Sequence, residues 1–192
     1  KRICDLMGNN KKREWALKLA VLGDPAVGKT SLINKYITGS FKENYTPTLG
    51  VNIVSKDIKL EEFNSKIRLL LWDIAGQDKY ELTRRSYFQG CVGALLIYDI
   101  SRYSTFEHIT TKWLEDFKKF STSNGVYILI GNKSDLSDSM KVSYEEGKSL
   151  SQDINAAEFI ETSAKYGDNV EEAFKKLVLF ILKKNGVNLE RN

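Results

Sequence analysis

Apolar runs of strand length alternate along this chain with longer stretches in which apolar residues recur at helical spacing. Three of the runs, at residues 17–23, 92–100 and 125–133, are nearly continuous, which is typical of mid-sheet strands covered on both faces. The alternation favours an α/β domain with a mostly parallel sheet and helices on both of its faces. Helices are expected at residues 31–39, 105–120, 142–154 and 168–184.

A β-hairpin is expected in the first half of the chain. Residues 51–60 and 66–74 both have strand-like composition, and only the short turn EEFNS separates them. Gly39 stands where the first helix should end, since glycine readily adopts the left-handed conformation found after a helix. Ser143 and Asp168 are the expected N-caps of two later helices.

The expected elements form one domain. Neither an internal repeat nor a linker rich in proline and glycine divides the 192 residues, and a hydrophobic content of 42% is enough for a sizeable core. We expect the domain to span residues 15–184. A basic, flexible extension is expected at residues 1–14 and a tail at residues 185–192.

Charge and cysteine content argue against several classes of protein. The formal net charge is only +4, so binding to nucleic acid is not expected. Cys4 and Cys91 are too few for a disulfide framework and lack the spacing of a zinc site. No apolar stretch approaches the roughly 18 residues of a membrane-spanning helix, and the basic start is not followed by a signal-peptide core. A cytoplasmic location is therefore expected.

The segment GDPAVGKT at residues 23–30 matches the phosphate-binding pattern G-x-x-x-x-G-K-[ST]. It lies between an expected strand and an expected helix, where backbone N–H groups and the helix N-terminus can surround phosphate oxygens. Lys29 would reach the β and γ phosphates, and the Thr30 hydroxyl would bind Mg²⁺. The candidate nucleotide contacts in and after this loop are Gly23, Asp24, Pro25, Ala26, Val27, Gly28, Lys29, Thr30 and Ser31.

A second candidate for metal binding lies at the end of the strand at residues 66–74. Asp73 would hold Mg²⁺ through water, because α/β sheets bind ligands at the carboxyl ends of their strands. Gly76 leaves room for a backbone N–H beside the γ phosphate, and the amide of Gln77 would orient an attacking water. On its own, the pattern D-x-x-G is as common in ordinary loops as in nucleotide-binding sites. Its position relative to the phosphate loop favours the functional interpretation.

Two short segments after later strands, GNKSD at residues 131–135 and TSAK at residues 162–165, are candidates for recognition of the base. The carboxylate of Asp135 can accept hydrogen bonds from the ring N–H and the amino group of guanine, whereas adenine would leave this charge unpaired. Guanine is therefore expected over adenine. The expected supporting residues are Asn132, Lys133, Ser163, Ala164 and Lys165.

With GDPAVGKT, WDIAGQ, NKSD and TSAK in this order, the chain resembles the Ras superfamily of small GTPases, and most closely its Rab-like members, over about residues 15–184. The resemblance implies the three-layer P-loop fold of small G-proteins, with a six-stranded, mostly parallel sheet and one antiparallel edge strand. It also implies two switch segments, at about residues 41–50 and 76–89, that change with the bound GTP or GDP. An exchange factor, a GTPase-activating protein and effector proteins are the implied partners.

The stretch FKENYTPTLG at residues 41–50 resembles the first switch of this family. By that likeness, Thr48 binds Mg²⁺ and the γ phosphate in the active state. Tyr45 closes over the phosphates, and Phe41 packs on the guanine. These three roles are implied by the resemblance alone.

Three features depart from the family pattern, one of which is that Ile74, Lys79 and Tyr80 stand where relatives usually carry threonine, arginine and phenylalanine. Pro25 stands where relatives usually carry a small residue facing the γ phosphate, and its bulk and missing N–H would hinder the arginine finger of an activating protein. The tail NGVNLERN contains no cysteine, so prenylation is not expected on this chain. Whether the protein is free in the cytoplasm or peripheral at a membrane is left open.

The expected function is a GTP hydrolase that works as a molecular switch. Gln77 would align the attacking water, while Lys29, Mg²⁺ and loop amides would stabilise the developing charge. One alternative is a module that binds guanine nucleotide with little or no hydrolysis. A second is an ATPase, which Asp135 opposes. His108 and Trp113 are interpreted as surface or packing residues, and Cys91 as a buried hydrophobe.

Overall fold

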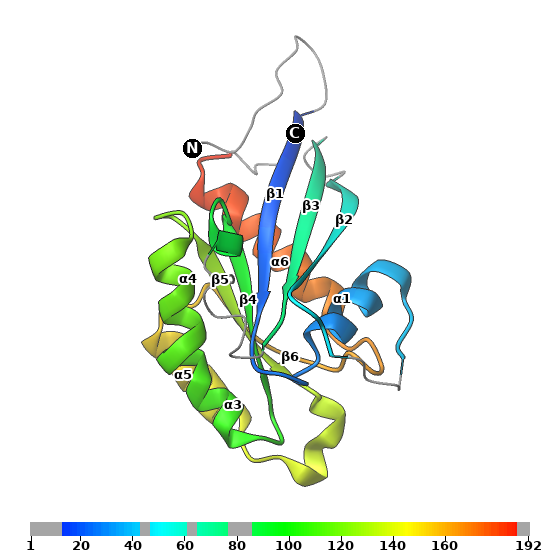
Figure 1. The fold of residues 1–192 in the computed structure, drawn as a ribbon, viewed down its shortest axis with the longest axis vertical. Coiled ribbons are helices and arrows are strands. Elements are labelled where there is room, and N and C mark those ends of the chain that lie inside the picture. Colours follow the sequence, from blue (N-terminus) through cyan, green and yellow to red (C-terminus); the bar gives the residue numbers. More distant parts are fainter. Residues whose placement is uncertain (1–12, 43–46, 61–64, 77–85, 188–192) are drawn as a thin grey trace.

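A six-stranded sheet forms the centre of the molecule (Figure 1). In the computed structural model, which describes residues 13–42, 47–60, 65–76 and 86–187, the strand order is β2-β3-β1-β4-β5-β6. All neighbouring strands are parallel except β2 and β3. The strands are β1 (Arg13–Leu22), β2 (Val51–Leu60), β3 (Ser65–Ile74), β4 (Gly93–Asp99), β5 (Val126–Asn132) and β6 (Phe159–Thr162).

Helices cover both faces of this sheet. They are α1 (Lys29–Thr38), α3 (Tyr103–His108), η3 (Ile109–Leu114), α4 (Glu115–Phe120), η4 (Ser134–Ser139), α5 (Tyr144–Asp153) and α6 (Val170–Lys184). α1 and α6 lie against one face, and the continuous run α3-η3-α4 lies with α5 against the other (Figure 1). η3 is a π-helical segment, and η4 is a 3₁₀ helix. Among the described helices, none combines the length and the apolar character that crossing a membrane requires.

The alternation of side chains along β1 divides the interior into two cores. Leu17, Leu19 and Val21 point into the core beneath α1 and α6, while Ala20 and Leu22 point into the core beneath the α3-η3-α4 run. All five are 1% exposed or less. Burying a leucine or valine side chain stabilises a fold by about 1.5–3 kcal/mol, so these contacts hold the central strand firmly between the helical layers.

Strand register brings distant polar residues together at the carboxyl edge of the sheet. Val21, just before the end of β1, is paired with Asp73 of β3. Asp99 is paired with Asn132, which in turn is paired with Thr162. Five successive parallel strands therefore end on the same side of the sheet, where α/β proteins bind their ligands.

Most expected elements are confirmed. β2 spans residues 51–60 and is antiparallel to β3, as the hairpin prediction requires. Gly39 follows α1 in a left-handed conformation with φ 70°. Ser143 caps α5 by accepting a hydrogen bond from the Glu146 N–H. β1 begins at Arg13, four residues before the expected start of this strand.

Two expectations at helix starts are wrong. The N-cap of α6 is Asn169 rather than Asp168; Asn169 adopts a left-handed φ of 57° and donates its side-chain N–H to the Glu161 carbonyl. The helix expected from Thr105 begins two residues earlier, at Tyr103. In both places several residues can begin a helix, and contacts with the rest of the fold decide which one does.

Candidate functional site

The loop after β1 depends on glycine at both of its ends. Gly23 has a φ of 149°, and a Cβ there would lie 2.1 Å from the Ile97 carbonyl oxygen. Gly28 has a φ of 100°, and a Cβ there would lie 2.2 Å from the side-chain nitrogen of Asn132. These approaches permit no side chain, because carbon atoms do not pack that closely. The two glycines thus fix the loop against β4 and against the end of β5.

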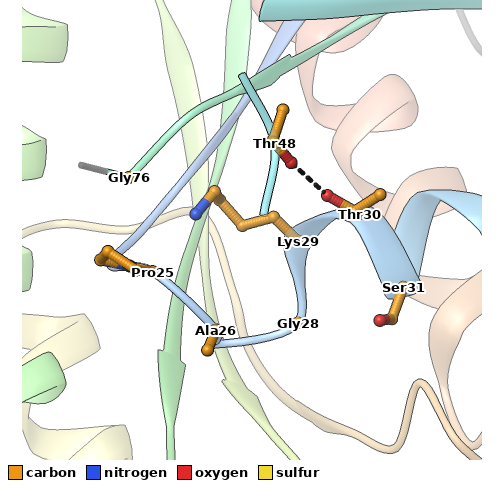
Figure 2. Close-up of a pocket in the computed structure, with 8 residues that line it drawn as sticks. All are labelled: Pro25, Ala26, Gly28, Lys29, Thr30, Ser31, Thr48 and Gly76. Carbon is orange, nitrogen blue, oxygen red and sulfur yellow. Dashed lines mark hydrogen bonds between the residues drawn. The ribbon is translucent and has the colours of Figure 1, made fainter. Parts of the chain in front are cut away.

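Lys29, the first residue of α1, folds its side chain back over this loop. Its ammonium donates to the carbonyl oxygens of Gly23, at 2.7 Å, and Asp24, at 2.8 Å. The side chain is only 5% exposed, so the hydrogen bonds satisfy a positive charge that is largely removed from water. Figure 2 shows its nitrogen pointing into a pocket that the loop, Thr48 and Gly76 line together. A positive charge in that position suits an anionic ligand.

Three oxygen-bearing side chains from separate elements meet beside Lys29. The hydroxyl of Thr30 lies 2.8 Å from the hydroxyl of Thr48 and donates to a carboxylate oxygen of Asp73 at 2.6 Å. Burial raises the pKa of Asp73, while hydrogen bonds from the two threonines and the charge of Lys29 oppose this effect. The other carboxylate oxygen of Asp73 is buried and has no hydrogen-bond partner among the described residues. Oxygen donors in this number and position fit Mg²⁺.

Gly76 packs directly on the phosphate loop. A Cβ on this residue would lie 2.5 Å from the Pro25 nitrogen and 2.7 Å from the Gly23 carbonyl oxygen. The segment after β3 can therefore touch the loop only if glycine occupies this position. Pro25 itself is exposed. Gln77 and Tyr45, the other two expected contacts near the phosphates, lie outside the described residues.

Asn132 at the end of β5 joins the phosphate loop to the segment after β6. Its side-chain nitrogen donates to the Val27 carbonyl at 2.7 Å. Its side-chain oxygen accepts from the Thr162 hydroxyl at 3.0 Å and from the Ala164 N–H at 3.3 Å. The residue is 1% exposed, so each of these bonds is protected from water. The Ala164 N–H, expected to line the base pocket, therefore also braces Asn132.

The carboxylate of Asp135 lies beside the TSAK segment, where its partner is the hydroxyl of Ser163 at 2.6 Å. The same hydroxyl accepts from the Tyr166 N–H at 3.1 Å, which fixes its direction. Asp135 is partly exposed. This leaves a carboxylate that is accessible to a ligand and held by a neighbouring strand end. Lys165 is exposed beside it, and Phe41 is partly buried after α1.

Lys133 adopts a left-handed φ of 68°, and its ammonium lies 2.7 Å from a carboxylate oxygen of Asp99. Asp99 also accepts from the hydroxyl and N–H of Ser101 and from Arg102. Burial raises the pKa of Asp99, but the hydrogen bonds from Lys133 and Ser101 outweigh burial, so the pKa lies below its ordinary value. Asp99 is thus a structural anion that orients Lys133. The sequence analysis did not single it out.

Two further residues, to which the sequence analysis assigned no role at this site, contact the phosphate loop. His108 was expected to be a surface or packing residue, yet its ring Nδ1 forms a 2.6 Å hydrogen bond with the Asp24 carboxylate. Trp113, although fully buried, donates its indole N–H to the other oxygen of the same carboxylate at 2.8 Å. Asp24 lies 84 and 89 residues away along the chain, so neither contact leaves a local pattern in the sequence. Cys91 is buried, as expected.

Comparison with known proteins found a matching family and several relatives. The sequence model of the Ras family matches residues 18–183. The chain is 38% identical over 164 residues to the Ras-related protein Rab-1 of Theileria parva, which covers 85% of this chain and 73% of that protein. It is 39% identical over 165 residues to the Ras-related protein RABA6b of Arabidopsis thaliana, covering 86% of this chain and 70% of that protein.

Proposed function

Since this chain belongs to the Ras family and is a Rab-like GTPase, a molecular switch that hydrolyses GTP, we propose that the site described above binds the nucleotide and carries out the reaction. One observation supports the proposal most strongly. Three groups converge on one edge of the sheet although they lie at the ends of three different strands, β1, β3 and β5: Lys29, the oxygen cluster around Asp73, and the carboxylate of Asp135.

The phosphates would lie in the loop between Gly23 and Thr30. Its backbone N–H groups and the N-terminus of α1 supply positive partial charge, and Lys29 supplies a full charge. In the present structure the Lys29 ammonium is bound to two loop carbonyls. Phosphate oxygens would compete for its N–H groups. The lysine would thereby neutralise charge that builds up on the γ phosphate during transfer.

The metal ion proposed here is Mg²⁺, held by the hydroxyls of Thr30 and Thr48 directly and by Asp73 through water. The hydrogen bonds that now join these side chains show that they lie within reach of one ion. When bound, Mg²⁺ would supply positive charge that offsets the negative charge of the phosphates. Binding at Asp73 requires the carboxylate form. Burial raises the pKa of Asp73, while the Thr30 hydrogen bond and the Lys29 charge oppose this effect.

Hydrolysis would proceed by in-line attack of water on the γ phosphate. We assign orientation of the water to Gln77, whose amide can accept from the water and donate to a phosphate oxygen. Gly76, which packs on the phosphate loop, would direct its N–H at the γ phosphate. No histidine base is required, because transfer of the γ phosphate depends on positioning and charge stabilisation.

Guanine selectivity would come from the carboxylate of Asp135. Its accessible oxygens would accept from the base, while Ser163 holds the carboxylate in place. Asn132 would keep the base pocket and the phosphate loop at a constant separation, because its side chain bonds to both. The stems of Lys133 and Lys165, together with the ring of Phe41, would flank the base.

The output of the site would be the conformation of two surface segments, at about residues 41–50 and 76–89. Thr48 connects the first segment to the oxygen cluster around Asp73, and Gly76 connects the second to the phosphate loop. Loss of the γ phosphate would remove their common ligand and release them. Effectors would bind the GTP form, and an exchange factor and an activating protein would control its lifetime. We assign the protein to trafficking or signalling at a cytoplasmic location, either free or peripheral at a membrane.

Single-turnover release of phosphate from bound GTP tests the catalytic assignment. Gln77→Leu should lower the hydrolysis rate roughly 10- to 100-fold, since a poorly placed nucleophile costs about that much. The affinity for GTP should be unchanged, because Gln77 acts on the water and not on the base. Gln89→Leu, an exposed glutamine in the same segment, is the matched control and should hydrolyse GTP at the wild-type rate.

An equal rate in the wild type and Gln77→Leu would contradict the role of Gln77. It would favour the alternative in which the nucleotide is held with little hydrolysis and the protein signals by occupancy. Membership of a family of GTPases already favours hydrolysis.

A further inference from the structure

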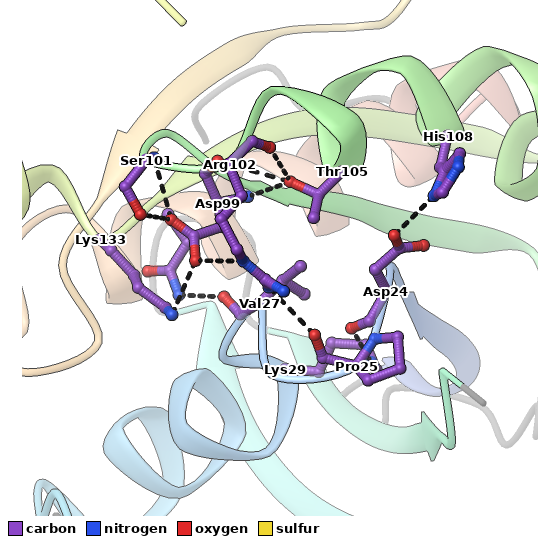
Figure 3. Close-up of polar contacts among 11 residues, drawn as sticks. Asp24, Pro25, Val27, Lys29, Asp99, Ser101, Arg102, Thr105, His108 and Lys133 are labelled. Atoms are coloured by element: carbon purple, nitrogen blue, oxygen red, sulfur yellow. Dashed lines mark hydrogen bonds and ion pairs between the residues drawn. The ribbon is translucent and has the colours of Figure 1, made fainter. Parts of the chain in front are cut away.

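Four side chains form a cluster, here called the loop clamp, that connects the phosphate loop to the helical run α3-η3-α4. The clamp consists of Asp24 in the loop, Arg102 just before α3, His108 at the end of α3, and Trp113 in η3. His108 and Trp113 each bond to one oxygen of the Asp24 carboxylate, at 2.6 and 2.8 Å. The Arg102 guanidinium donates to the Pro25 carbonyl at 3.0 Å. Figure 3 shows His108 and Arg102 reaching the loop from the same side.

The π-helical segment explains how His108 and Trp113 reach the same carboxylate. Residues five apart point about 140° away from each other around an α-helix, which has 3.6 residues per turn. In a π turn, hydrogen bonds run between residues five apart, so such residues lie nearly above one another. η3 begins immediately after His108 and contains Trp113. Such turns frequently occur at functional sites.

The clamp holds the backbone of the loop from two directions. The side chain of Asp24 is bound to the helices, while its carbonyl accepts from Lys29 at 2.8 Å. Asp24 is only 8% exposed, and a buried carboxylate is costly unless donors satisfy it. Arg102 is itself fixed by a 2.9 Å bond to the Asp99 carboxylate. The peptide groups of Asp24 and Pro25 therefore have little freedom to rotate.

We propose that the loop clamp positions the phosphate loop for nucleotide, so that His108 and Trp113, acting through Asp24, set how long GDP and GTP remain bound. This rests on the proposed function, in which the loop holds the phosphates. Neither residue needs to touch the nucleotide. A loop that has lost its clamp would present its N–H groups and Lys29 in several orientations, and binding would require that one of them be selected.

Dissociation of a fluorescent GDP derivative from the full chain, measured with Mg²⁺ and excess unlabelled GDP, tests this proposal. His108→Ala and Trp113→Phe should each raise the dissociation rate about tenfold, as expected for loss of one hydrogen bond to a charged group. His108→Asn keeps a donor near the position of Nδ1 and should restore most of the wild-type residence time. Trp113→Phe keeps an aromatic ring in the core, so the helical layer should remain folded.

A double-mutant cycle separates positioning from general loosening of the fold. Asp24→Ala combined with Trp113→Phe should release GDP no faster than Asp24→Ala alone, because Asp24→Ala already removes the acceptor of the Trp113 hydrogen bond. Phe117→Leu is the matched control. Phe117 is buried in the same helical run, but its apolar ring has no donor for a hydrogen bond to the loop. Its substitution should leave GDP dissociation within about twofold of the wild type.

Three results would overturn the loop clamp: wild-type dissociation rates in both His108→Ala and Trp113→Phe, additive effects in the cycle, or an equal acceleration in Phe117→Leu. The proposed function has a separate control. If the wild type binds GDP tightly and Lys29→Ala does not, phosphate binding by the loop stands whatever the clamp variants do. A wild type that fails to bind GDP would instead contradict the proposed function itself.

Discussion

Asp99 illustrates how one buried carboxylate organises several residues of the site. It accepts from both the hydroxyl and the N–H of Ser101, and it forms ion pairs with Arg102 and Lys133. Through Arg102 it reaches the phosphate loop, and through Lys133 it reaches the segment expected to bind the base. Its pKa falls below the ordinary value because these partners outweigh the effect of burial. Its negative charge is therefore needed at neutral pH.

Asp99→Asn should lower the free energy of unfolding at pH 7 by about 1–3 kcal/mol, because Lys133 and Arg102 lose their common anion. A carboxyl whose pKa is lowered by folding stabilises the protein above its unfolded pKa, and this contribution disappears as pH falls through the folded pKa. The difference between wild type and variant should thus be constant near neutrality. The difference in unfolding free energy should shrink as the pH falls below 3.8, the ordinary pKa of an aspartate.

Urea unfolding from pH 7 to pH 3, at fixed GDP and Mg²⁺ concentrations, measures this difference. Asp153→Asn, which changes an exposed carboxylate in α5, is the matched control and should alter stability by less than about 0.5 kcal/mol. A difference for Asp99→Asn that stays constant down to pH 3 would show that its charge does not contribute.

Among the elements, α5 shows how local sequence chemistry determines a helix. Ser143 accepts from the Glu146 N–H at 3.2 Å, and the Glu146 carboxylate accepts from the Ser143 N–H at 2.8 Å. This reciprocal pair satisfies donors that the first turn cannot pair within the helix. α5 packs beside the edge strand β6, which begins at Phe159 and leads to TSAK.

Ser143→Ala should lower the free energy of unfolding by about 1 kcal/mol, as loss of an N-cap usually does. Thermal or urea unfolding at constant GDP concentration measures the change. Ser149 is exposed to solvent in the middle of the same helix. Ser149→Ala should be neutral or slightly stabilising, since alanine favours helix. Equal losses in both variants would assign the effect to the helix in general rather than to the cap.

Sequence patterns predicted those elements whose signals are local. β2 has the expected bounds because its strand-like composition stops at the turn-forming residues EEFNS in the sequence. Ser143 was identifiable because its partner is three residues away. The π turn was not predictable, since its apolar residues also fit an α-helix. Asn169 prevailed over Asp168 because its side chain reaches Glu161 across a loop.

In the site too, residues with a local sequence signal could be predicted and residues placed by long-range contacts could not. Thr30, Thr48 and Asp73 could be proposed from motifs, and the structure brings their oxygens together. His108 and Trp113 could not, because only the packing of the helical run on this face of the sheet places them beside Asp24. Long-range polar contacts of this kind depend on how a helix is rotated, and helix periodicity alone does not specify that rotation.

At the scale of the whole molecule, strand order explains why the site exists. β1 lies between β3 and β4. The next two strands along the chain, β2 and β3, lie on one side of β1, and β4, β5 and β6 lie on the other. Open parallel sheets bind ligands at such a point, because the loops on either side diverge and leave space. The phosphate loop follows β1 directly. Residues from 23 to 165 thus meet along one edge of a single sheet.

The affinities for GTP and ATP, measured by the same fluorescence titration in Mg²⁺, test the central claim most directly. The wild type should bind GTP more tightly than ATP by roughly 10⁴- to 10⁵-fold, because adenine leaves the Asp135 carboxylate unpaired. Asp135→Ala should lose most of this preference by weakening GTP binding. Asp138→Ala, an exposed carboxylate in the same 3₁₀ helix, should keep it. Equal affinity of the wild type for both nucleotides would contradict a guanine site at this edge of the sheet.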